Sequence, residues 1–220
     1  MVMAIVPAYN EGKKIEQVVK DLLLQVDSVV VIDDASTDKT GVHAKRAGAH
    51  VLSHRINRGQ GAALETGHIY ARMMGADYVV HFDGDGQMSA QDIPPALEHL
   101  KENNADMLVG SRYLGQATNM PWSKRNILAP LARLVDRIFS GVKLTDSHCG
   151  FRVLGQKALG LIHITQDGMA HATQIIALSK QQGLRLVEFP VHITYEHYGQ
   201  GALGGLKIIK ELILGKIMKL

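Results

Sequence analysis

The first half of the chain alternates short apolar runs, typical of buried strands, with segments whose apolar residues recur at helical spacing. The runs span residues 2–6, 28–32, 49–52, 78–82 and 107–109, and the helical segments span residues 11–26, 37–47, 61–74 and 93–101. Strands that alternate with helices of this length form a mainly parallel sheet covered by helices on both faces. The pattern therefore predicts an α/β fold in which ligands bind beyond the carboxyl ends of the strands.

The second half is less regular. It predicts helices over 123–140 and 169–181 and strands over 150–154 and 185–193. Pro190 lies inside the last of these strands and favours an edge position, because proline cannot donate a hydrogen bond to a neighbouring strand. At 220 residues the chain fits one domain, which we place at residues 1–200.

Residues 201–220 carry apolar residues at helical spacing, with four lysines against one glutamate. This pattern is typical of a basic amphipathic helix that lies on an anionic membrane surface. A helix that packs on the domain or on a dimer partner has the same pattern. Peripheral membrane contact and a protein contact therefore both stay open, and so does the oligomeric state.

Composition narrows the classes of partner. The net charge of +3 fits an anionic ligand or an anionic lipid. Aromatic residues make up only 5% and no run of five basic residues occurs, which disfavours a nucleic-acid partner. Cys149 is the only cysteine, which excludes an internal disulfide and fits a reducing cytoplasm. The sequence shows neither an apolar stretch of 18 residues nor a signal peptide, so we expect no membrane-spanning helix and a cytoplasmic location.

Two carboxylates follow the apolar run at 78–82, where the predicted strand opens into solvent. The residues are Asp83-Gly84-Asp85-Gly86-Gln87, and the glycines allow a tight turn or the close approach of a ligand. Carboxylate oxygens at a strand end suit Mg²⁺ or Mn²⁺. Considered alone, Asp83 and Asp85 are explained equally well as solvent-exposed carboxylates in a polar turn that binds no ligand. Polar clusters at 7–11 and 33–34 also follow predicted strands, so we expect three clusters to converge on one edge of the sheet.

Six short segments occur along the chain in a specific order. They are Val6-Pro7-Ala8-Tyr9-Asn10-Glu11, Val31-Ile32-Asp33-Asp34-Ala35-Ser36-Thr37-Asp38, Asn57-Arg58-Gly59-Gln60-Gly61, Asp83-Gly84-Asp85-Gly86-Gln87, Gly110-Ser111-Arg112-Tyr113 and Gly150-Phe151-Arg152. Together they resemble the inverting GT-A glycosyltransferases of family 2, and within that family the dolichol- and polyprenyl-phosphate sugar synthases. The resemblance implies a GT-A type, Rossmann-like sheet and a nucleoside-diphosphate-sugar donor, with Mg²⁺ or Mn²⁺ as cofactor.

The same resemblance implies the residues of the donor site. The nucleotide-sugar pocket would comprise Pro7, Tyr9, Glu11, Ile32, Asp34, Gly61, Asp83, Gly84, Asp85, Gln87 and Arg112. Asp83, Asp85 and Gln87 would surround the metal, with Asp85 as the first choice of direct ligand, and the metal would neutralise the leaving diphosphate. Tyr9 offers a flat face for a base, although a turn residue that packs on the sheet fits its position too.

Neighbouring residues have alternative roles. Of Asp33 and Asp34, we expect one to cap the next helix and the other to bind the ligand. Gly59 and Gly61 precede a helix, and we expect their backbone to approach the nucleotide.

Arginines are the expected phosphate contacts, because a guanidinium group matches phosphate oxygens. Arg112 follows a strand end, and with Arg125 it is expected to hold the acceptor phosphate, although a solvated helix face also explains Arg125. Arg152 is expected to be structural and to pair with Asp146. The expected catalytic set is Asp85, Arg112 and Asp146. Asp146 would serve as a general base, a role that His148 could share.

The acceptor decides whether a base is needed. A polyprenyl phosphate is already an anionic nucleophile, whereas a sugar hydroxyl must lose a proton to a carboxylate. The polyprenyl-phosphate branch usually shows Gly-x-Ser-Lys-Leu after the last strand, and this chain has Gly199-Gln200-Gly201-Ala202-Leu203. We expect transfer of a hexose of the mannose or glucose type to a polyprenyl or dolichyl phosphate at the cytoplasmic face of a membrane. The alternative is a saccharide hydroxyl acceptor, and a nucleotidyltransferase is disfavoured because residues 7–11 are acidic and poor in glycine.

Overall fold

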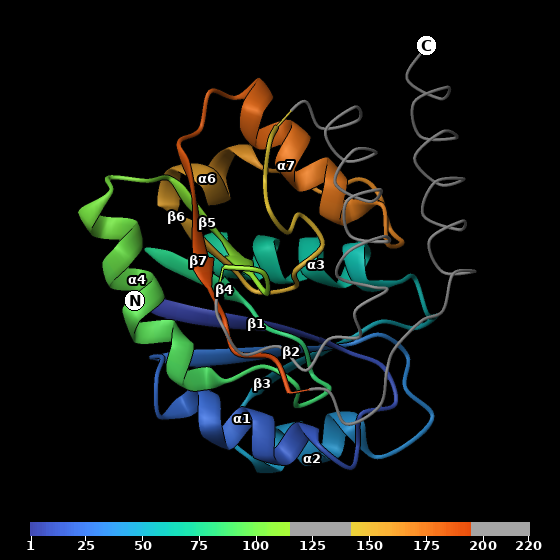
Figure 1. The fold of residues 1–220 in the computed structure, drawn as a ribbon. Helices are drawn as coiled ribbons and strands as arrows, with labels where there is room; N and C mark the ends of the chain where they lie inside the picture. Colours follow the sequence, from blue (N-terminus) through green and yellow to red (C-terminus); the bar gives the residue numbers. More distant parts are fainter. Residues whose placement is uncertain (115–141, 195–220) are drawn as a thin grey trace, which may run out of the picture.

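The computed structural model describes residues 1–114 and 142–194, and these residues form a seven-stranded sheet (Figure 1). The strands are β1 (Val2–Ala8), β2 (Ser28–Asp33), β3 (His50–Ser53), β4 (Tyr78–His81), β5 (Met107–Ser111), β6 (Arg152–Gly155) and β7 (Leu186–Pro190). Their order across the sheet is β3-β2-β1-β4-β6-β5-β7. β6 runs antiparallel to both of its neighbours, and the other pairs are parallel. The predicted mainly parallel α/β sheet is therefore confirmed.

Helices cover both faces of this sheet (Figure 1). One face carries α1 (Ile15–Leu23), α2 (Thr40–Arg46) and α4 (Ile93–Glu102), and the other carries α3 (Gln60–Met73), α6 (Gln156–Leu161) and α7 (His171–Gln181). A short 3₁₀ turn, η1 (Ala90–Asp92), leads into α4. Along β1, Ala4 and Val6 face the first group of helices, and Met3 and Ile5 face the second. Because side chains alternate along a strand and both faces are covered, the whole strand is apolar.

Two helices begin later than predicted, because the loops before them bond to each other. The carboxylate of Asp38 accepts the N–H of Thr40 at 2.9 Å and the N–H of Gly12 at 2.9 Å. α1 therefore begins at Ile15 rather than at residue 11, and α2 begins at Thr40 rather than at residue 37. Asp38 thus accepts the first N–H of α2, that of Thr40.

The second half of the chain completes the sheet. The strand predicted at 150–154 is β6, and the strand predicted at 185–193 is β7. β7 lies at the edge of the sheet, as its proline predicted. The short helix α6 was not predicted, because six residues are too few to show helical periodicity.

Several predictions fall outside the described residues. They concern the helix at 123–140, Arg125, the segment 199–203 and the helix at 201–220. The placement of one domain at residues 1–200 likewise stays a prediction. In the ranges 1–114 and 142–194, no helix is both long enough and apolar enough to cross a membrane.

Candidate active site

The loops that follow β1, β2 and β4 meet at one edge of the sheet. Asn10 joins the first two loops, since its N–H donates to Ser36 Oγ at 3.0 Å and its Oδ1 accepts the N–H of Thr37 at 2.9 Å. Gly84, in the loop after β4, packs against the carbonyl oxygen of Pro7 at the end of β1. The expected convergence of three polar clusters is therefore observed.

Carboxylates crowd this edge. Loss of solvent and the charge of Asp85 raise the pKa of Asp83 to about 6. Burial and the charge of Asp85 also raise the pKa of Glu11. Burial is the larger cause of both shifts, and the nearby charge of Asp85 adds to each. Oxygen donors arranged in this way suit a hard divalent cation.

The described part of the chain does not form a complete metal site by itself. Within it, no three His, Cys, Asp or Glu side chains gather as a group that could hold a metal ion. A cation at Asp83 and Asp85 would therefore need further oxygen ligands, such as the side chain of Gln87, water or phosphate. Mg²⁺ is commonly bound in this way, by one or two carboxylates together with substrate phosphates.

The carboxylate of Asp83 is fixed from two sides. Gln60, the first residue of α3, donates from Nε2 to Asp83 Oδ1 at 2.9 Å. On the other side a Cβ atom on Gly150 would overlap Asp83 Oδ2, so only glycine lets the backbone pack against this carboxylate. The charges of Arg152 and Arg112 are also close enough to oppose the rise in the pKa of Asp83.

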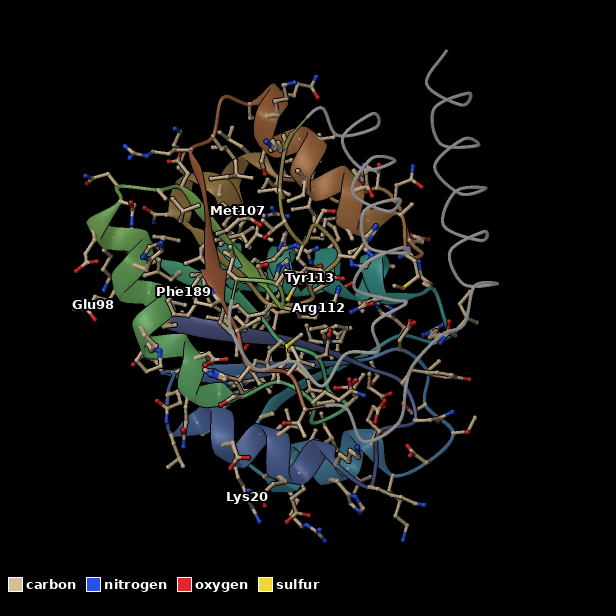
Figure 2. All side chains as sticks on the ribbon, in the orientation of Figure 1. Lys20, Glu98, Met107, Arg112, Tyr113 and Phe189 are labelled. Atoms are coloured by element: carbon tan, nitrogen blue, oxygen red, sulfur yellow. The ribbon has the colours of Figure 1, made fainter. Side chains whose placement is uncertain are left out.

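Arg112, the first residue after β5, is held by Asp146. Its Nε donates to Asp146 Oδ2 at 2.6 Å, and its Nη2 donates to Oδ1 at 2.7 Å. Its backbone N–H also donates to Oδ2 at 3.1 Å. The side chain of Asp146 is 3% exposed and that of Arg112 is 25% exposed. Figure 2 shows Arg112 beside Tyr113 just past the end of β5. The pair therefore presents a guanidinium group of fixed orientation close to Asp83.

The expected pairing of Arg152 with Asp146 is wrong, because Asp146 bonds to Arg112 instead. Arg152 lies on β6 and is 1% exposed, and its Nη2 donates to the carbonyl oxygen of Ser147 at 3.0 Å. Burial lowers the pKa of this guanidinium group. Arg152 thus contributes a buried positive charge within the sheet.

Asp34 and Ile32 were predicted to line the nucleotide pocket, and the structure gives their side chains other contacts. The carboxylate of Asp34 accepts the N–H of Arg58 at 3.0 Å and the N–H of Gly59 at 2.7 Å, and it bonds to His54 Nδ1 at 2.6 Å. The side chain of Ile32 is fully buried in the core. Asp33 Oδ1 accepts the N–H of Ser36 at 3.0 Å. Both aspartates therefore shape loops, and a contact of one of them with the ligand stays a prediction.

Gly61 was predicted to let the nucleotide approach the backbone, and this space is filled by the chain itself. A Cβ atom on Gly61 would overlap the carbonyl oxygen of Gln166. The N–H groups of Gly61 and Ala62 donate to the carbonyl oxygen of Asp167 at 2.8 and 3.3 Å. The N–H groups of Gly61 and Ala62 are therefore satisfied within the protein, and a contact of Gly61 with the nucleotide stays a prediction.

Comparison with known proteins adds to this geometry. A family model described as glycosyl transferase family 2 matches residues 3–161, which is more than half of the chain. The chain belongs to glycosyl transferase family 2. The predicted family membership is confirmed, and with it the prediction of a glycosyltransferase.

Family 2 relatives align along nearly their whole length. An uncharacterized protein of Methanocaldococcus jannaschii is 33% identical over 98% of this chain and 92% of its own. An undecaprenyl-phosphate mannosyltransferase of Micrococcus luteus is 30% identical over 93% of this chain and 88% of its own. A UDP-N-acetylglucosamine–dolichyl-phosphate N-acetylglucosaminyltransferase of Methanococcus voltae is 28% identical over 100% of this chain and 97% of its own.

Solved structures support the predicted GT-A type fold. Glucosyl-3-phosphoglycerate synthase from Mycobacterium tuberculosis, crystallised with UDP, superposes with a TM-score of 0.74. It is 20% identical and covers 97% of this chain and 79% of its own. At this identity the likeness concerns the fold.

The predicted residues of the family 2 site thus divide into two groups. The first group lies at the end of β1 and in the loops after β1, β4 and β5, and it comprises Pro7, Tyr9, Glu11, Asp83, Gly84, Asp85, Gln87 and Arg112. Tyr9 is 48% exposed, so its ring is accessible to a ligand. Ile32, Asp34 and Gly61 form the second group, in which Ile32 packs in the core and Asp34 and Gly61 bond to neighbouring segments. Gln60 was missed, because a glutamine at the start of a predicted helix carries no signal of its partner.

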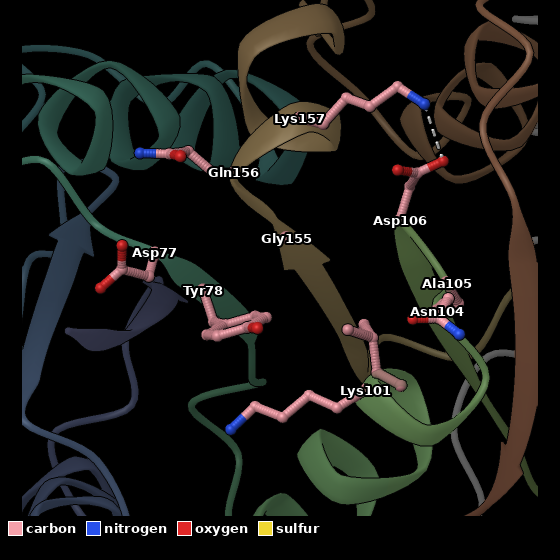
Figure 3. Close-up of a pocket in the computed structure, with 10 residues that line it drawn as sticks. Asp77, Tyr78, Lys101, Asn104, Ala105, Asp106, Gly155, Gln156 and Lys157 are labelled. Atoms are coloured by element: carbon pink, nitrogen blue, oxygen red, sulfur yellow. Dashed lines mark hydrogen bonds and ion pairs between the residues drawn. The ribbon is translucent and has the colours of Figure 1, made fainter.

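The described residues also form a groove of about 460 Å³ at the opposite edge of the sheet, near the starts of β4 and β5 (Figure 3). Its charged side chains contact one another: Lys157 pairs with Asp106 at 3.1 Å, and Lys101 lies over the ring of Tyr78 at 5.2 Å. The groove is remote from Asp83 and Arg112. It therefore does not contribute to the candidate active site.

Proposed function

We propose that this glycosyltransferase moves a hexose of the mannose or glucose type from a nucleoside-diphosphate sugar to a polyprenyl or dolichyl phosphate. The names of the relatives from Micrococcus luteus and Methanococcus voltae support a lipid-phosphate acceptor. The protein would work at the cytoplasmic face of a membrane, with residues 201–220 as an amphipathic helix in peripheral contact.

The donor site would use the group of residues around the carboxylates. The ring of Tyr9 would stack on the base, with Pro7 and Glu11 beside it. Gly84 leaves room next to the end of β1. Asp34 would act through the loop that it holds, and Ile32 through the core beneath the site, because their side chains are already engaged.

Asp83, Asp85 and Gln87 would hold Mg²⁺ or Mn²⁺. The donors fit this group, because the crowded carboxylates are hard ligands whose mutual repulsion a divalent cation would relieve. The metal would neutralise the charge that develops on the leaving nucleoside diphosphate. Crystal structures of the glucosyl-3-phosphoglycerate synthase contain Mg²⁺ or Mn²⁺ with UDP, which is consistent with this assignment.

One observation favours the lipid-phosphate acceptor. Both carboxylate oxygens of Asp146 accept hydrogen bonds from Arg112, so the expected general base is already engaged. An acceptor phosphate is anionic and needs no base, and it would gain from a fixed guanidinium group. Arg112, together with Arg125, would therefore hold the acceptor phosphate. Asp146 would act by orienting Arg112, which revises its expected role as a base.

A saccharide hydroxyl acceptor is the second candidate. The observation in its favour is the replacement of the Ser-Lys pair of the polyprenyl-phosphate branch by Gly201 and Ala202. With this acceptor, Asp146 or His148 would have to take the proton of the hydroxyl group.

A turnover assay tests the proposal. The protein is incubated with Mn²⁺ or Mg²⁺, a panel of nucleoside-diphosphate sugars and a short polyprenyl phosphate, and the released nucleoside diphosphate and the glycolipid are measured. The proposal expects metal-dependent glycolipid that is absent with Asp85→Ala. If donor turnover requires a saccharide and yields no glycolipid, the acceptor is a saccharide hydroxyl and not a lipid phosphate.

A further inference from the structure

Gln60 approaches the candidate metal site from the start of α3. Its Nε2 donates to Asp83 Oδ1 at 2.9 Å, and both residues are half-buried. In the part of the chain that the structure describes, Gln60 is the one side chain that donates a hydrogen bond to this carboxylate. Gly150 closes the opposite side of the carboxylate. The orientation of Asp83 therefore depends on one amide group.

The backbone on both sides of Gln60 is fixed. The N–H of Gly59 donates to Asp34 Oδ2 at 2.7 Å, and the N–H of Gly61 donates to the carbonyl oxygen of Asp167 at 2.8 Å. A side chain on either glycine would overlap the segment that contains Asp167. This clamp holds the Cα of Gln60 in place, so only the side-chain rotamer has to be ordered for its amide to reach Asp83.

The chemistry of the donor is informative. An amide donates a hydrogen bond without adding charge, whereas a lysine or arginine in its place would pair with the carboxylate and compete with a cation. Each carboxylate oxygen has further lone pairs, so the bond to Gln60 leaves acceptor capacity for a metal. The charges of Arg112 and Arg152 are already close to Asp83. A third positively charged side chain at position 60 would weaken the binding of a metal ion further.

We propose that Gln60 is a positioning residue for the divalent metal, which orients the carboxylate of Asp83 through a neutral donor and so preserves its negative charge for the cation. The inference rests on the proposed function, because it concerns the same metal site. In this role Gln60 acts through Asp83 and needs no contact of its own with the metal or the substrates.

The test measures Mn²⁺ binding rather than turnover. The full chain is titrated with MnCl₂ in the presence of UDP and, separately, GDP, and bound Mn²⁺ is followed by electron paramagnetic resonance. Gln60→Met keeps the length of the side chain and removes the donor, and Gln60→Lys keeps a donor and adds a charge. Gln17→Met is the matched control, because Gln17 Nε2 donates to Asp21 Oδ1 at 2.8 Å on the exposed face of α1. Thermal melting of each variant reports whether it is folded.

We expect the dissociation constant for Mn²⁺ to rise roughly 5- to 10-fold in Gln60→Met, the worth of one typical hydrogen bond. A larger rise is expected in Gln60→Lys, and no change in Gln17→Met. A folded Gln60 variant of either kind that binds Mn²⁺ as the wild type does would overturn the inference alone. A purely structural role would lower the melting temperature and leave the Mn²⁺ affinity of the folded protein unchanged. A wild-type protein that binds no Mn²⁺ with either nucleotide would overturn the proposed function and the inference together.

Discussion

Two aspartate clusters lie at the same edge of the sheet, after β2 and after β4, the strands on either side of β1, and their surroundings differ. Asp34, after β2, accepts hydrogen bonds from two backbone N–H groups and bonds to His54. Asp83, after β4, accepts one hydrogen bond from a side chain, that of Gln60, and lies close to the charge of Asp85. The first carboxylate is satisfied by the chain. The second has fewer partners than its charge requires.

This difference separates a carboxylate that builds the site from one that binds a ligand. A buried carboxylate with several donors stabilises the loop that supplies them. A carboxylate with one donor and an acidic neighbour keeps a raised pKa, and a cation would relieve it. The number of donors, rather than the presence of aspartate, therefore distinguishes the cluster that we propose to bind the metal.

The largest effect is expected for Asp85→Ala, which removes the proposed direct metal ligand. We expect turnover to fall about a thousandfold, which corresponds to about 4 kcal/mol in the activation free energy. The melting temperature without metal should stay the same or rise, because a charge that repels Asp83 and Glu11 is lost. Release of the nucleoside diphosphate measures the first effect and a thermal melt the second. A variant that retains a tenth of the activity would mean that Asp85 is not the principal ligand.

The next largest effect is expected for Asp34→Ala, which removes the carboxylate that is satisfied by donors of the chain itself. The N–H groups of Arg58 and Gly59 would lose their acceptor in a buried place. We expect the free energy of unfolding to fall by about 3 kcal/mol, because unsatisfied buried donors are costly. Urea denaturation measures this loss. If stability were unchanged while nucleotide binding disappeared, Asp34 would be a ligand residue after all.

The sequence predicted the sheet, its edge and most of the loops that carry the site, because these depend on local patterns. Alternating apolar runs placed β1, β2 and β4, and acidic residues after them marked the carboxyl edge. The roles of Asp34 and Gly61 were not predictable, since they depend on contacts with residues 58–59 and 166–167 that no local pattern encodes. For the same reason the sequence paired Asp146 with Arg152, although the chain folds Arg112 onto it.

A smaller effect is expected for Asp83→Asn, which removes the buried negative charge of Asp83 and keeps an oxygen acceptor for Gln60. The pKa of Asp83 is raised to about 6 in the folded protein, so this group holds its proton more tightly there than in the unfolded chain. Between about pH 4 and pH 6, Asp83 therefore lowers the free energy of unfolding as pH rises. Without metal at pH 7, we expect the variant to be about 1–2 kcal/mol more stable than the wild type.

The measurement is urea denaturation of both proteins from pH 4 to pH 8, with and without Mn²⁺. The comparison with the variant is needed because burial lowers the pKa of His68 to about 3 and that of His171 to about 4. These histidines make stability rise with pH over the same range, which is the opposite sign. Equal stability of the two proteins at every pH would show that the charge of Asp83 does not destabilise the folded protein.

The smallest effect is expected for Asp33→Ala, which sharpens the comparison within one cluster. Asp33 is half-buried and its carboxylate accepts the N–H of Ser36, whereas the adjacent Asp34 is 3% exposed and has several donors. We expect the free energy of unfolding to fall by about 1 kcal/mol, the worth of one hydrogen bond at a site that water can reach. Turnover and Mn²⁺ binding should stay within about twofold of the wild type. The measurement is urea denaturation of the Asp33→Ala and Asp34→Ala variants side by side, which gives the free energy of unfolding of each. Equal losses in the two variants would contradict the argument that the number of donors distinguishes the aspartates, whereas a loss about a third as large would support it.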